Sequence, residues 1–366
     1  MRIVQIIDSL EAGGAERMAI NYANALAHRI EFSGLIATRR EGILLDQLDK
    51  KVQYLYLKKK RKIDFNAIFR LRKYIKKYKV NVIHAHSSSF FMAVLVKVIL
   101  PEIKIIWHDH YGVSQDLSVR KNLGLKFGSF FFAGAIAVNS ALKNWAESYL
   151  WCSNISYFPN FIDDYKKSDE KIFLEGSEGK RIICVANLRP QKNHKLLINA
   201  AKSIKDKFPD WSFHLFGKDF NDAYSDTLRE KVKDLKLQNV VYFYGTTYNV
   251  SSALEQCDIA VLPSLSEGLP LAILEYGSHK LPVVVTDVGE ISKIITSDKL
   301  GLMVNSNDLN QFEESIRRLI ENENERIEMG LRLNAHIQIN FSQKSIIDKY
   351  ALWLSSLINF VTKNTL

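Results

Sequence analysis

The sequence predicts an α/β protein built from two Rossmann-like, doubly wound domains. Short apolar segments alternate with helical patterns along the whole chain, as is typical of parallel sheets with helices on both faces. The 366 residues, of which 47% are hydrophobic and 25% charged, are sufficient for two cores of ordinary size. Apolar periodicity lapses at 160–181, where charges, Gly and Ser gather, so we expect the two domains to meet there.

We expect an N-terminal domain at 1–162, a C-terminal domain at 163–343, and a last amphipathic helix at 344–366 that packs back on the N-terminal domain. The expected strands share near-continuous apolar character, which suits strands buried on both faces. In the first half they are 2–8, 32–37, 80–86, 104–110 and 134–140. In the second half they are 180–188, 212–218, 239–245, 258–264, 281–288 and 301–305.

Composition and apolar runs exclude several classes of protein. Cys152, Cys184 and Cys257 are far apart and have neither metal-ligand nor redox spacing, which favours a reducing compartment over a disulfide framework. The N-terminal apolar run is too short for a signal peptide, and 87–96 and 128–142 fall short of the roughly 18 to 20 residues of a membrane span. We therefore expect a cytoplasmic protein.

The net charge of +10 is concentrated in one segment. Residues 50–79 contain thirteen Lys or Arg and one acid, and they include KKKRK at 58–62. Phe65, Ile68, Phe69, Arg72 and Ile75 fall at helical spacing, which gives an apolar stripe beside a basic face. One interpretation is a solvated outer helix with its stripe on the sheet, and another is contact with an anionic membrane surface. Nucleic acid is disfavoured, because no stacking-aromatic or recognition-helix motif is present.

Parallel sheets bind ligands beyond the carboxyl ends of their strands. Gly13 and Gly14 follow the first strand and precede a helix expected from about Ala15, so the backbone there can approach a ligand closely. A tight turn without a ligand explains the same glycine pair. The G-x-G-x-x-G spacing of a dinucleotide site is absent from this stretch.

Two H-x-H pairs mark other strand ends, His84 with His86 and His108 with His110. Alternate residues of a strand share a face, so each pair offers two imidazoles to one metal, and a metal-dependent hydrolase is one alternative. No supporting carboxylates stand out at the other strand ends. This favours histidines that hydrogen-bond within the site or that pack structurally.

The loop after the first strand of the second half, within 187–200, carries Arg189 and Lys192. It leads into a helix whose free amides, together with these two charges, can converge on a diphosphate. A purely structural role is the alternative for two basic residues at a strand end.

The stretch SLSEGLPLAILE at 264–275 places two carboxylates eight positions apart. We expect a helix from about Leu269 with Pro270 in its first turn, which puts Glu267 before the helix and Glu275 about 12 Å further along the axis. An acid and base pair of a glycosidase lies about 5 to 9.5 Å apart. The wider spacing here suits two acids that hold the sugar hydroxyls and the ribose diol of one sugar nucleotide.

Four stretches together resemble the retaining nucleotide-sugar glycosyltransferases of family 4, which have the GT-B fold. They are GGAER at 13–17, NFID at 160–163, VANLRPQKNHKLLINA at 185–200, and 257–289, which includes the E-x7-E element. The resemblance runs from about residue 1 to 357 and is strongest in the second half. It implies two Rossmann-like domains facing a cleft, with the donor bound mainly by the C-terminal domain, the acceptor by the N-terminal domain, and no catalytic metal.

Carried over by position, the resemblance implies that Glu267 contacts the transferred sugar, Glu275 the ribose and Lys192 the diphosphate. The other donor-site candidates are Gly13, Gly14, Gly217, Tyr244, Gly245, Gly268 and Leu269. Many members carry arginine at the position of Asn187, and we assign that phosphate-binding role to Arg189. The cleft histidine of the family corresponds to either His108 or His110.

The implied reaction moves a hexosyl group from a UDP- or GDP-sugar to an acceptor hydroxyl with retained anomeric configuration. The expected acceptor is a growing lipid-linked, capsular or lipopolysaccharide glycan, and the basic segment at 58–79 would place the enzyme at the inner face of the plasma membrane. A nucleotide-sugar epimerase of related fold, which needs no acceptor, is a second alternative.

Overall fold

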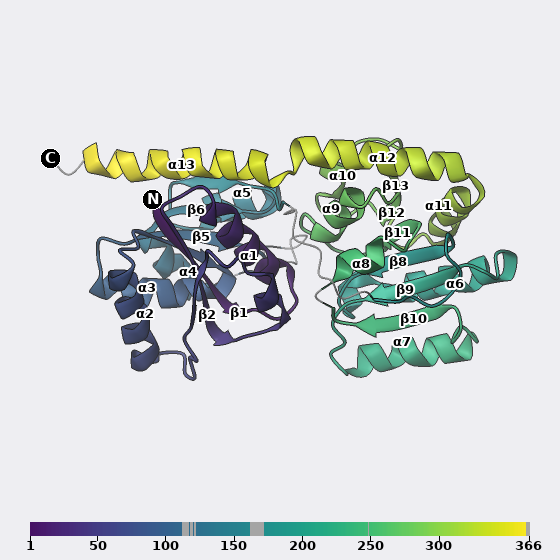
Figure 1. Cartoon of the computed structure of the whole chain (residues 1–366), viewed down its shortest axis with the longest axis horizontal. Coiled ribbons are helices and arrows are strands. Elements are labelled where there is room, and N and C mark those ends of the chain that lie inside the picture. The colour runs from purple at the N-terminus through teal and green to yellow at the C-terminus, as the bar shows by residue number, and fades with distance from the viewer. Residues whose placement is uncertain (112–116, 118–119, 121, 162–171, 248, 364–366) are drawn as a thin grey trace. The chain divides into compact units, whose positions relative to one another are not determined.

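A computed structural model describes the chain except for residues 112–116, 118–119, 121, 162–171, 248 and 364–366 (Figure 1). The chain forms two compact units. Unit 1 comprises Met1–Asp163 and Ser342–Leu366, and unit 2 comprises Asp164–Phe341. The expected linker at 160–181 falls partly outside the described residues. Among the described helices, none combines the length and the apolar character that a membrane span requires.

Unit 1 is built on a seven-stranded sheet in the order β3-β2-β1-β4-β5-β6-β7, with every neighbouring pair parallel. The strand order reverses direction between β1 and β4. That reversal is the point at which doubly wound sheets bind ligands. The strands are β1 (Arg2–Ser9), β2 (Phe32–Arg40), β3 (Gln53–Tyr56), β4 (Val82–His86), β5 (Lys104–Asp109), β6 (Phe132–Ala137) and β7 (Ile155–Tyr157).

The helices of unit 1 pack in two groups, since α1 contacts α13 whereas α3 contacts α2 and α4. The α-helices are α1 (Gly14–Ala27), α2 (Phe65–Lys77), α3 (Phe90–Ile99), α4 (Leu123–Gly128), α5 (Ser140–Tyr149) and α13 (Gln343–Lys363). Short 3-10 helices are η1 (Ile43–Gln47), η2 (Ser87–Ser89) and η3 (Ser129–Phe131). The two edge strands, β3 and β7, were not predicted, because they have four and three residues and no buried apolar run.

The apolar stripe expected on α2 is wrong in its two aromatic members. The buried side chains of this helix are Ala67, Ile68, Leu71, Tyr74 and Ile75. Phe65 is 69% exposed and Phe69 is 61% exposed, so both lie away from the core. Sequence spacing alone does not separate them from Ile68, which is buried, because the stripe and the exposed rings are neighbours around the helix.

The C-terminal helix α13 packs on unit 1, as expected. The hydroxyl of buried Tyr350 lies 3.2 Å from Nδ1 of His84 on β4. Gly134 of β6 faces Trp353 and Leu357, and a Cβ on this glycine would lie within 2.9 Å of both side chains. The missing side chain therefore allows the helix to lie directly on the sheet.

Unit 2 contains a six-stranded parallel sheet in the order β10-β9-β8-β11-β12-β13. Its order reverses between β8 and β11, which makes their carboxyl ends the second expected ligand-binding edge. The strands are β8 (Arg181–Val185), β9 (Ser212–Phe216), β10 (Val241–Gly245), β11 (Ile259–Leu262), β12 (Val283–Thr286) and β13 (Leu302–Val304). All six were predicted from their apolar runs.

The helices of unit 2 include one that begins later than expected. They are η4 (Pro190–Lys192), α6 (His194–Lys207), α7 (Ala223–Asp234), α8 (Val250–Leu254), α9 (Leu271–Ser278), α10 (Ile291–Ile294), α11 (Leu309–Glu321) and α12 (Glu323–Asn340). We expected α9 to start near Leu269 with Pro270 in its first turn. Instead Pro270 is the N-cap with an extended ψ of 124°, which keeps it outside the helix.

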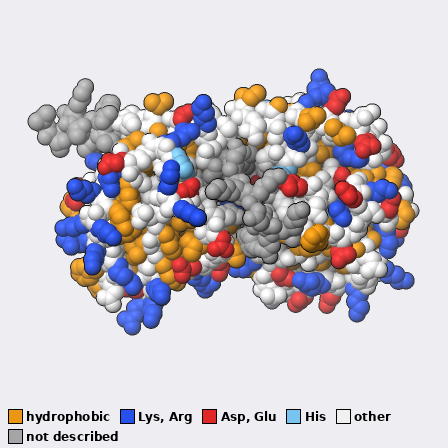
Figure 2. Space-filling model, viewed as in Figure 1, with side chains coloured by type: hydrophobic (Ala, Val, Ile, Leu, Met, Phe, Trp, Pro, Cys, Tyr) orange, Lys and Arg blue, Asp and Glu red, His pale blue; other side chains and the backbone are white. Residues whose placement is uncertain are grey.

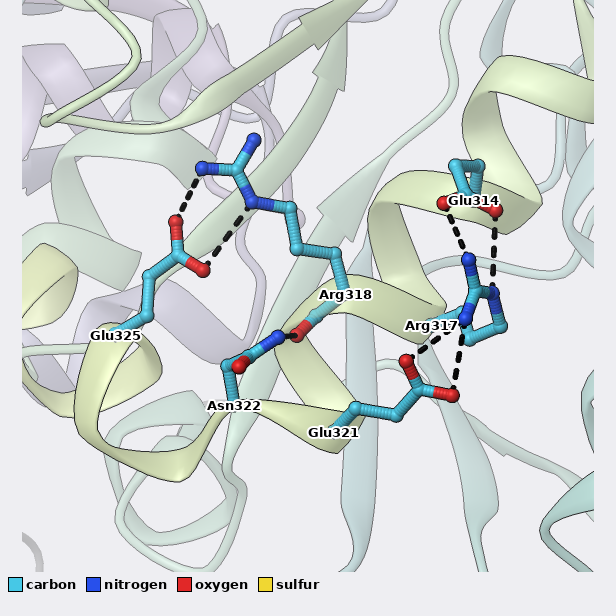
Figure 3. Close-up of polar contacts among 6 residues, drawn as sticks. All are labelled: Glu314, Arg317, Arg318, Glu321, Asn322 and Glu325. Carbon is cyan, nitrogen blue, oxygen red and sulfur yellow. Dashed lines mark hydrogen bonds and ion pairs between the residues drawn. The ribbon is translucent and has the colours of Figure 1, made fainter.

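Ion pairs lie on the surface of α11, and one of them connects α11 to α12 (Figure 3). Arg317 lies between Glu314 and Glu321, with Nη1 at 2.8 Å from Glu321 Oε2. Arg318 pairs with Glu325 of α12, with Nε at 3.2 Å from Oε2. Exposed pairs of this kind contribute little to stability, so the packing of α12 on α9 is the stronger restraint on α12.

That packing depends on two helical glycines and supplies a stability test. A Cβ on Gly330 would lie 1.9 Å from the backbone oxygen of Lys280, whereas a Cβ on Gly277 would meet Ile337 and Leu333 side-chain atoms at 2.2 and 2.8 Å. Alanine raises the helix propensity at both sites. The side chains near position 277 can shift to make room for a Cβ, whereas the backbone oxygen near position 330 cannot. We expect Gly330→Ala to lower the free energy of unfolding of unit 2 by about 2 to 3 kcal/mol and Gly277→Ala by less.

Urea denaturation of the two matched variants and the wild type measures this difference. Equal losses of stability in both variants would show that the approach of α12 to the backbone of Lys280 is not the tighter contact.

Candidate functional site

The carboxyl ends of β8, β11 and β12 are adjacent in unit 2, because β11 pairs with both β8 and β12. The loop after β8 carries Lys192 and the loop after β11 carries Glu267, both of which the sequence predicted as site residues. These residues are 75 positions apart in the chain. Parallel topology therefore brings two predicted residues to one edge of the sheet.

Lys192 and Glu267 contact each other directly. Nζ of Lys192 donates to Oε1 of Glu267 at 2.6 Å, and Oγ of Ser264 donates to the same oxygen at 2.6 Å. The Glu267 side chain is 7% exposed and that of Lys192 is 24% exposed. The carboxylate is thus nearly excluded from water and held by two donors, whereas the ammonium keeps part of its hydration.

Backbone contacts fix the loop that carries Glu267. Leu265 N donates to Gln191 O in the loop after β8 (2.8 Å), and Ser264 O accepts from Thr286 Oγ1 at the end of β12 (2.5 Å). Gly268 O accepts from Glu290 N in the loop after β12 (3.0 Å). Gly289 has φ of +62°, and a Cβ there would lie 2.0 Å from the backbone oxygen of Glu267. Only glycine fits this position. Sequence analysis missed Ser264 and Gly289, although both lie within the motif stretch.

Glu275 lies on α9 and is partly buried. The adjacent Tyr276 anchors this helix, since its hydroxyl accepts from Val185 N at 2.7 Å and donates to Val261 O at 3.3 Å. Glu275 is therefore carried by a helix tied to the two strands at the reversal of strand order. Leu269 is 2% exposed, so its side chain packs inward and only its backbone can serve a ligand.

Arg189 does not join the Lys192 and Glu267 pair in the described contacts. It is exposed, and its guanidinium carbon lies 4.2 Å from the centroid of the Phe220 ring. Asn187, where many family members carry arginine, has a structural contact instead, because its Oδ1 accepts from Lys218 N at 2.8 Å. This bond joins the loops after β8 and β9.

The base-side candidates lie at the end of β10, as Tyr244 and Gly245, and directly after β9, as Gly217. The ring of Tyr244 stacks on Phe216 with centroids 4.5 Å apart, and its hydroxyl lies 2.9 Å from Nδ1 of His214. Gly245 has φ of +70° and nothing within 4 Å of an added Cβ. Gly217 has φ of +153°, and a Cβ there would lie 2.1 Å from Ala186 O. The fold itself therefore requires glycine at position 217.

In unit 1, Gly13 and Gly14 lie where α1 begins. Gly13 is the N-cap in an extended conformation, and a Cβ on it would meet only the flexible end of Glu16. A Cβ on Gly14 would meet nothing within 4 Å. The protein's own packing therefore does not require glycine at position 14, which leaves access for a ligand as a reason for it.

The two predicted histidine pairs form one block on β4 and at the end of β5. Nε2 of His84 lies 3.1 Å from Nδ1 of His108, and Nδ1 of His86 lies 2.9 Å from Nε2 of His110. His84, His86 and His108 are at most 1% exposed, and each offers a ligand atom within 4.8 Å of the others. His110 is the only member of the block that is partly exposed. Sequence analysis predicted each pair but not their union, which needs the parallel register of β4 and β5.

Burial keeps the block neutral. It lowers the pKa values of His84, His86 and His108 well below the ordinary value, and loss of hydration lowers the pKa of His110 to about 3. Each imidazole therefore has one protonated and one unprotonated ring nitrogen at neutral pH.

A buried ion pair that sequence analysis missed lies beside His110. Asp109 accepts from Nη1 and Nη2 of Arg120 at 2.6 and 2.8 Å. The guanidinium carbon also lies 4.2 Å from the Tyr111 ring centroid and 4.1 Å from that of Trp145. An acidic residue within the apolar strand expected at 104–110 was the one sign in the sequence that such a pair exists. Its partner is eleven residues away and could not be identified from spacing.

Two doubly wound domains, one of which pairs a base and an acid at its strand-order reversal, are typical of enzymes that bind nucleotides. Comparison with family models makes the class specific. Residues 12–166 match the glycosyltransferase family 4 model, and residues 166–332 match the model for glycosyl transferases group 1. The chain belongs to the group 1, family 4 type of glycosyltransferase, and these matches lend no support to the epimerase or hydrolase alternatives.

Individual relatives agree with this assignment. The chain is 26% identical over 331 residues to the Escherichia coli UDP-Gal:alpha-D-GlcNAc-diphosphoundecaprenol alpha-1,3-galactosyltransferase, covering 84% of this chain and 85% of that protein. Among solved structures, a Rickettsia africae glycosyltransferase has a TM-score of 0.77 at 18% identity, with 98% of each chain covered. Anabaena HepE in complex with UDP-glucose has a TM-score of 0.78 at 17% identity, covering 97% of this chain and 100% of that one. The predicted GT-B fold is confirmed.

The neutral histidine block predicts a loss of stability in acid. Below a pH of about 6.5 the unfolded chain protonates these histidines while the folded chain does not, so the unfolded state binds more protons and stability falls as the pH falls. Each histidine contributes up to about 1.4 kcal/mol per pH unit. Buried His194 and His214 of unit 2, whose pKa values burial lowers to about 4 and 3, act in the same direction.

Amide hydrogen exchange of β4 and β5 at pH 7.5, 6.5 and 5.5, corrected for the intrinsic rates, reports the effect on unit 1 alone. Opening free energies that do not change between pH 6.5 and 5.5 would contradict a neutral block. His110→Gln removes one of the four imidazoles. It should reduce the slope of the opening free energy against pH by up to about 1.4 kcal/mol per pH unit, which corresponds to one proton.

Proposed function

We propose that this protein is a retaining hexosyltransferase that moves a sugar from a nucleoside diphosphate to an acceptor hydroxyl, with no metal in the reaction. The contact of Lys192 with Glu267 at the strand-order reversal of unit 2 carries the proposal. Unit 2 would bind the donor and unit 1 the acceptor. An epimerase would not need an acceptor, so the requirement for one separates the two activities.

In the proposed donor complex the diphosphate takes the place of Glu267 as the partner of Lys192. Glu267 is then released to accept hydrogen bonds from the transferred sugar, and Ser264 keeps its carboxylate in position. Glu275 accepts from the ribose hydroxyls, because a carboxylate binds two hydroxyl donors well. The free amides at the start of α9 favour the phosphates between these two acids.

The departing diphosphate gains negative charge as the glycosidic bond breaks. Lys192 and Arg189 would therefore bind the transition state more tightly than the ground state, which is the requirement for catalysis. Arg189 is exposed and held by the face of one aromatic ring, so moving to the phosphates breaks no described ion pair. In a front-face displacement, the leaving phosphate oxygen accepts the proton of the attacking hydroxyl, so configuration is retained without a protein nucleophile.

In unit 1, Gly14 would leave room for a ligand at the start of α1, and His110 would contact the acceptor bound to this unit. Of the two candidate histidines, His110 is partly exposed and His108 is 1% exposed, which favours His110 for this role. Its ring nitrogen Nε2 is engaged with His86 Nδ1 at 2.9 Å. A neutral ring held in this way can direct its other nitrogen toward a hydroxyl.

The relatives favour a UDP-sugar and a lipid-linked acceptor. The Escherichia coli relative uses UDP-Gal and a diphosphoundecaprenol-linked sugar, and a Campylobacter jejuni relative, 24% identical over 231 residues, is named for a diphospho-undecaprenol acceptor. The Anabaena structure contains UDP-glucose. By analogy, the acceptor proposed here is a sugar or glycan carried on a lipid diphosphate.

Such an acceptor requires access to a membrane surface, and α2 with the segment before it suits that requirement. Lys58, Lys60, Arg61 and Lys62 are exposed, whereas Lys59 is 7% exposed and belongs to the interior. Figure 2 shows Lys and Arg side chains with hydrophobic ones between them over the part of unit 1 where α2 and α3 lie. Exposed Phe65 and Phe69 add apolar contact to the charge. We propose a peripheral location on the inner face of the plasma membrane.

Donor binding and transfer test the proposed site. UDP and UDP-sugars should raise the melting temperature of the wild type in the presence of EDTA, through binding to the folded state alone. Glu267→Gln and Lys192→Ala should each lower kcat by about 100- to 1,000-fold. Lys202→Ala, in an exposed pair with Asp206, is the matched control and should leave kcat unchanged.

Product analysis from the same assay decides the stereochemistry and the need for an acceptor. An inverted product, loss of activity with EDTA, or full activity in Glu267→Gln would each contradict a part of this proposal. GDP-sugars tested in parallel decide the base.

Vesicle binding tests the membrane surface. The wild type should sediment with vesicles containing anionic lipid, and less so as salt rises. Replacing Lys58, Lys60, Arg61 and Lys62 by Gln should weaken binding at least ~10-fold, since each basic residue near the surface contributes about 1 kcal/mol. A variant with Lys231, Lys233 and Lys236 of unit 2 replaced by Gln is the control. Equal binding by both variants would contradict the assignment of this surface.

A further inference from the structure

The donor chemistry uses at most one ring of the histidine block, and the other three rings are arranged as a ligand set. His84, His86 and His108 come from neighbouring parallel strands, with His86 and His108 directly opposite in the register. All three are buried, and one ligand atom from each lies within 4.8 Å of the others. Three convergent imidazoles are the protein ligands of several zinc sites.

The distance between two of these nitrogens is that of neighbours around one metal ion. Nitrogen ligands at about 2.0 to 2.1 Å from a tetrahedral zinc ion are roughly 3.3 Å apart. Nε2 of His84 and Nδ1 of His108 are 3.1 Å apart. An ion can therefore replace this hydrogen bond with only a small outward movement of the two rings.

The outer nitrogens of His84 and His86 also have the oxygen partners of metal ligands. Tyr350 Oη lies 3.2 Å from Nδ1 of His84, so the hydroxyl can accept from this ring when Nε2 faces an ion. Gln5 Oε1 lies 2.8 Å from Nε2 of His86. A proton on Nε2 of His86, directed at this oxygen, leaves the lone pair on Nδ1. That atom lies 2.9 Å from Nε2 of His110 and would exchange this contact for the ion. Oxygen partners on the outer nitrogens orient histidine ligands in known metal sites.

Two further observations set the block apart from a satisfied hydrophobic core. Among the described residues, Nε2 of His108 and the hydroxyl of Tyr22 are buried without a hydrogen-bond partner. The Tyr22 ring packs edge-on against His84 and His108, with centroids 4.9 and 5.5 Å away.

We propose that His84, His86 and His108 bind one divalent transition-metal ion of the zinc class in the core of unit 1. Neutral nitrogen ligands favour zinc, cobalt or nickel over magnesium or calcium. The ion is structural, because the three rings are shielded from solvent and no substrate can reach the fourth position of a tetrahedral ion among them. It would connect β4 to β5 and, through Tyr350, fasten the C-terminal helix α13 to the sheet.

Cobalt binding by the full chain, produced without a histidine tag, tests the proposal. The protein is treated with EDTA, dialysed and titrated with Co²⁺, and bound metal is measured by elemental analysis and by the visible d–d absorption of cobalt. We expect one Co²⁺ per chain, a visible band of a low-coordinate nitrogen site, and a rise in melting temperature of about 5 °C. Wild-type protein that retains no stoichiometric cobalt would overturn the proposal, whatever the behaviour of any variant.

Variants decide whether the ion is at this site. His108→Gln should lose the bound cobalt and its band, whereas His28→Gln, which alters an exposed histidine of the same unit, should keep both. Tyr350→Phe should keep the stoichiometry and weaken binding about 10-fold, as expected for an outer partner of a ligand. Cobalt retained unchanged by folded His108→Gln would show adventitious binding and would also overturn the proposal.

The readout is independent of the proposed transferase reaction. UDP binding by unit 2 should persist after treatment with EDTA even when the cobalt site is empty, so failure of either proposal leaves the other testable.

Discussion

The candidate donor site depends on how a nearly buried carboxylate is held in place. Glu267 is 7% exposed, and taking an ionised acid out of water costs free energy unless donors compensate for it. Lys192 and Ser264 provide that compensation at 2.6 Å each. They orient the acid and keep it in contact with a base that, in the proposed donor complex, turns to the diphosphate. A partly buried ion pair is a poor device for stability. The proposed donor site would give this pair a use in binding.

The rest of the unit 2 edge supports this carboxylate. Three loops, after β8, β11 and β12, are joined by hydrogen bonds, and the positive φ of Gly289 lets one loop pass within contact distance of the Glu267 backbone. Tyr276 ties α9 to β8 and β11, which fixes Glu275 relative to the same edge. A site assembled from loops becomes as rigid as the strands to which the loops are bound.

Unit 1 shows a different solution to the placement of polar groups at a sheet edge. The four histidines of its block contact one another rather than charged partners, and burial keeps them neutral. Asp109 is the exception, and it is matched by the two-pronged contact of Arg120. Much of the positive charge of this unit is instead on its surface, at 50–79, where side chains stay hydrated and where we propose contact with an anionic membrane.

The sequence by itself determined the architecture and predicted the principal residues of the candidate donor site. Continuous apolar runs predicted the strands of both sheets, apart from the short edge strands β3 and β7, because a strand buried on both faces must be apolar throughout. Lys192 and Glu267 were also predicted, because polar residues directly after such strands lie at the ligand-binding edge.

Only the tertiary structure decided which residues meet. The pairing of Lys192 with Glu267, the supporting role of Ser264 and the union of two histidine pairs all depend on strand order and register, which bring together residues distant in the chain. It likewise decided that Phe65 and Phe69 face solvent, and that Pro270 precedes α9 instead of lying within it. Local sequence patterns carry information about neighbours along one helix or strand. These contacts form between elements, so they depend on how the elements pack and not on the spacing of residues in the sequence.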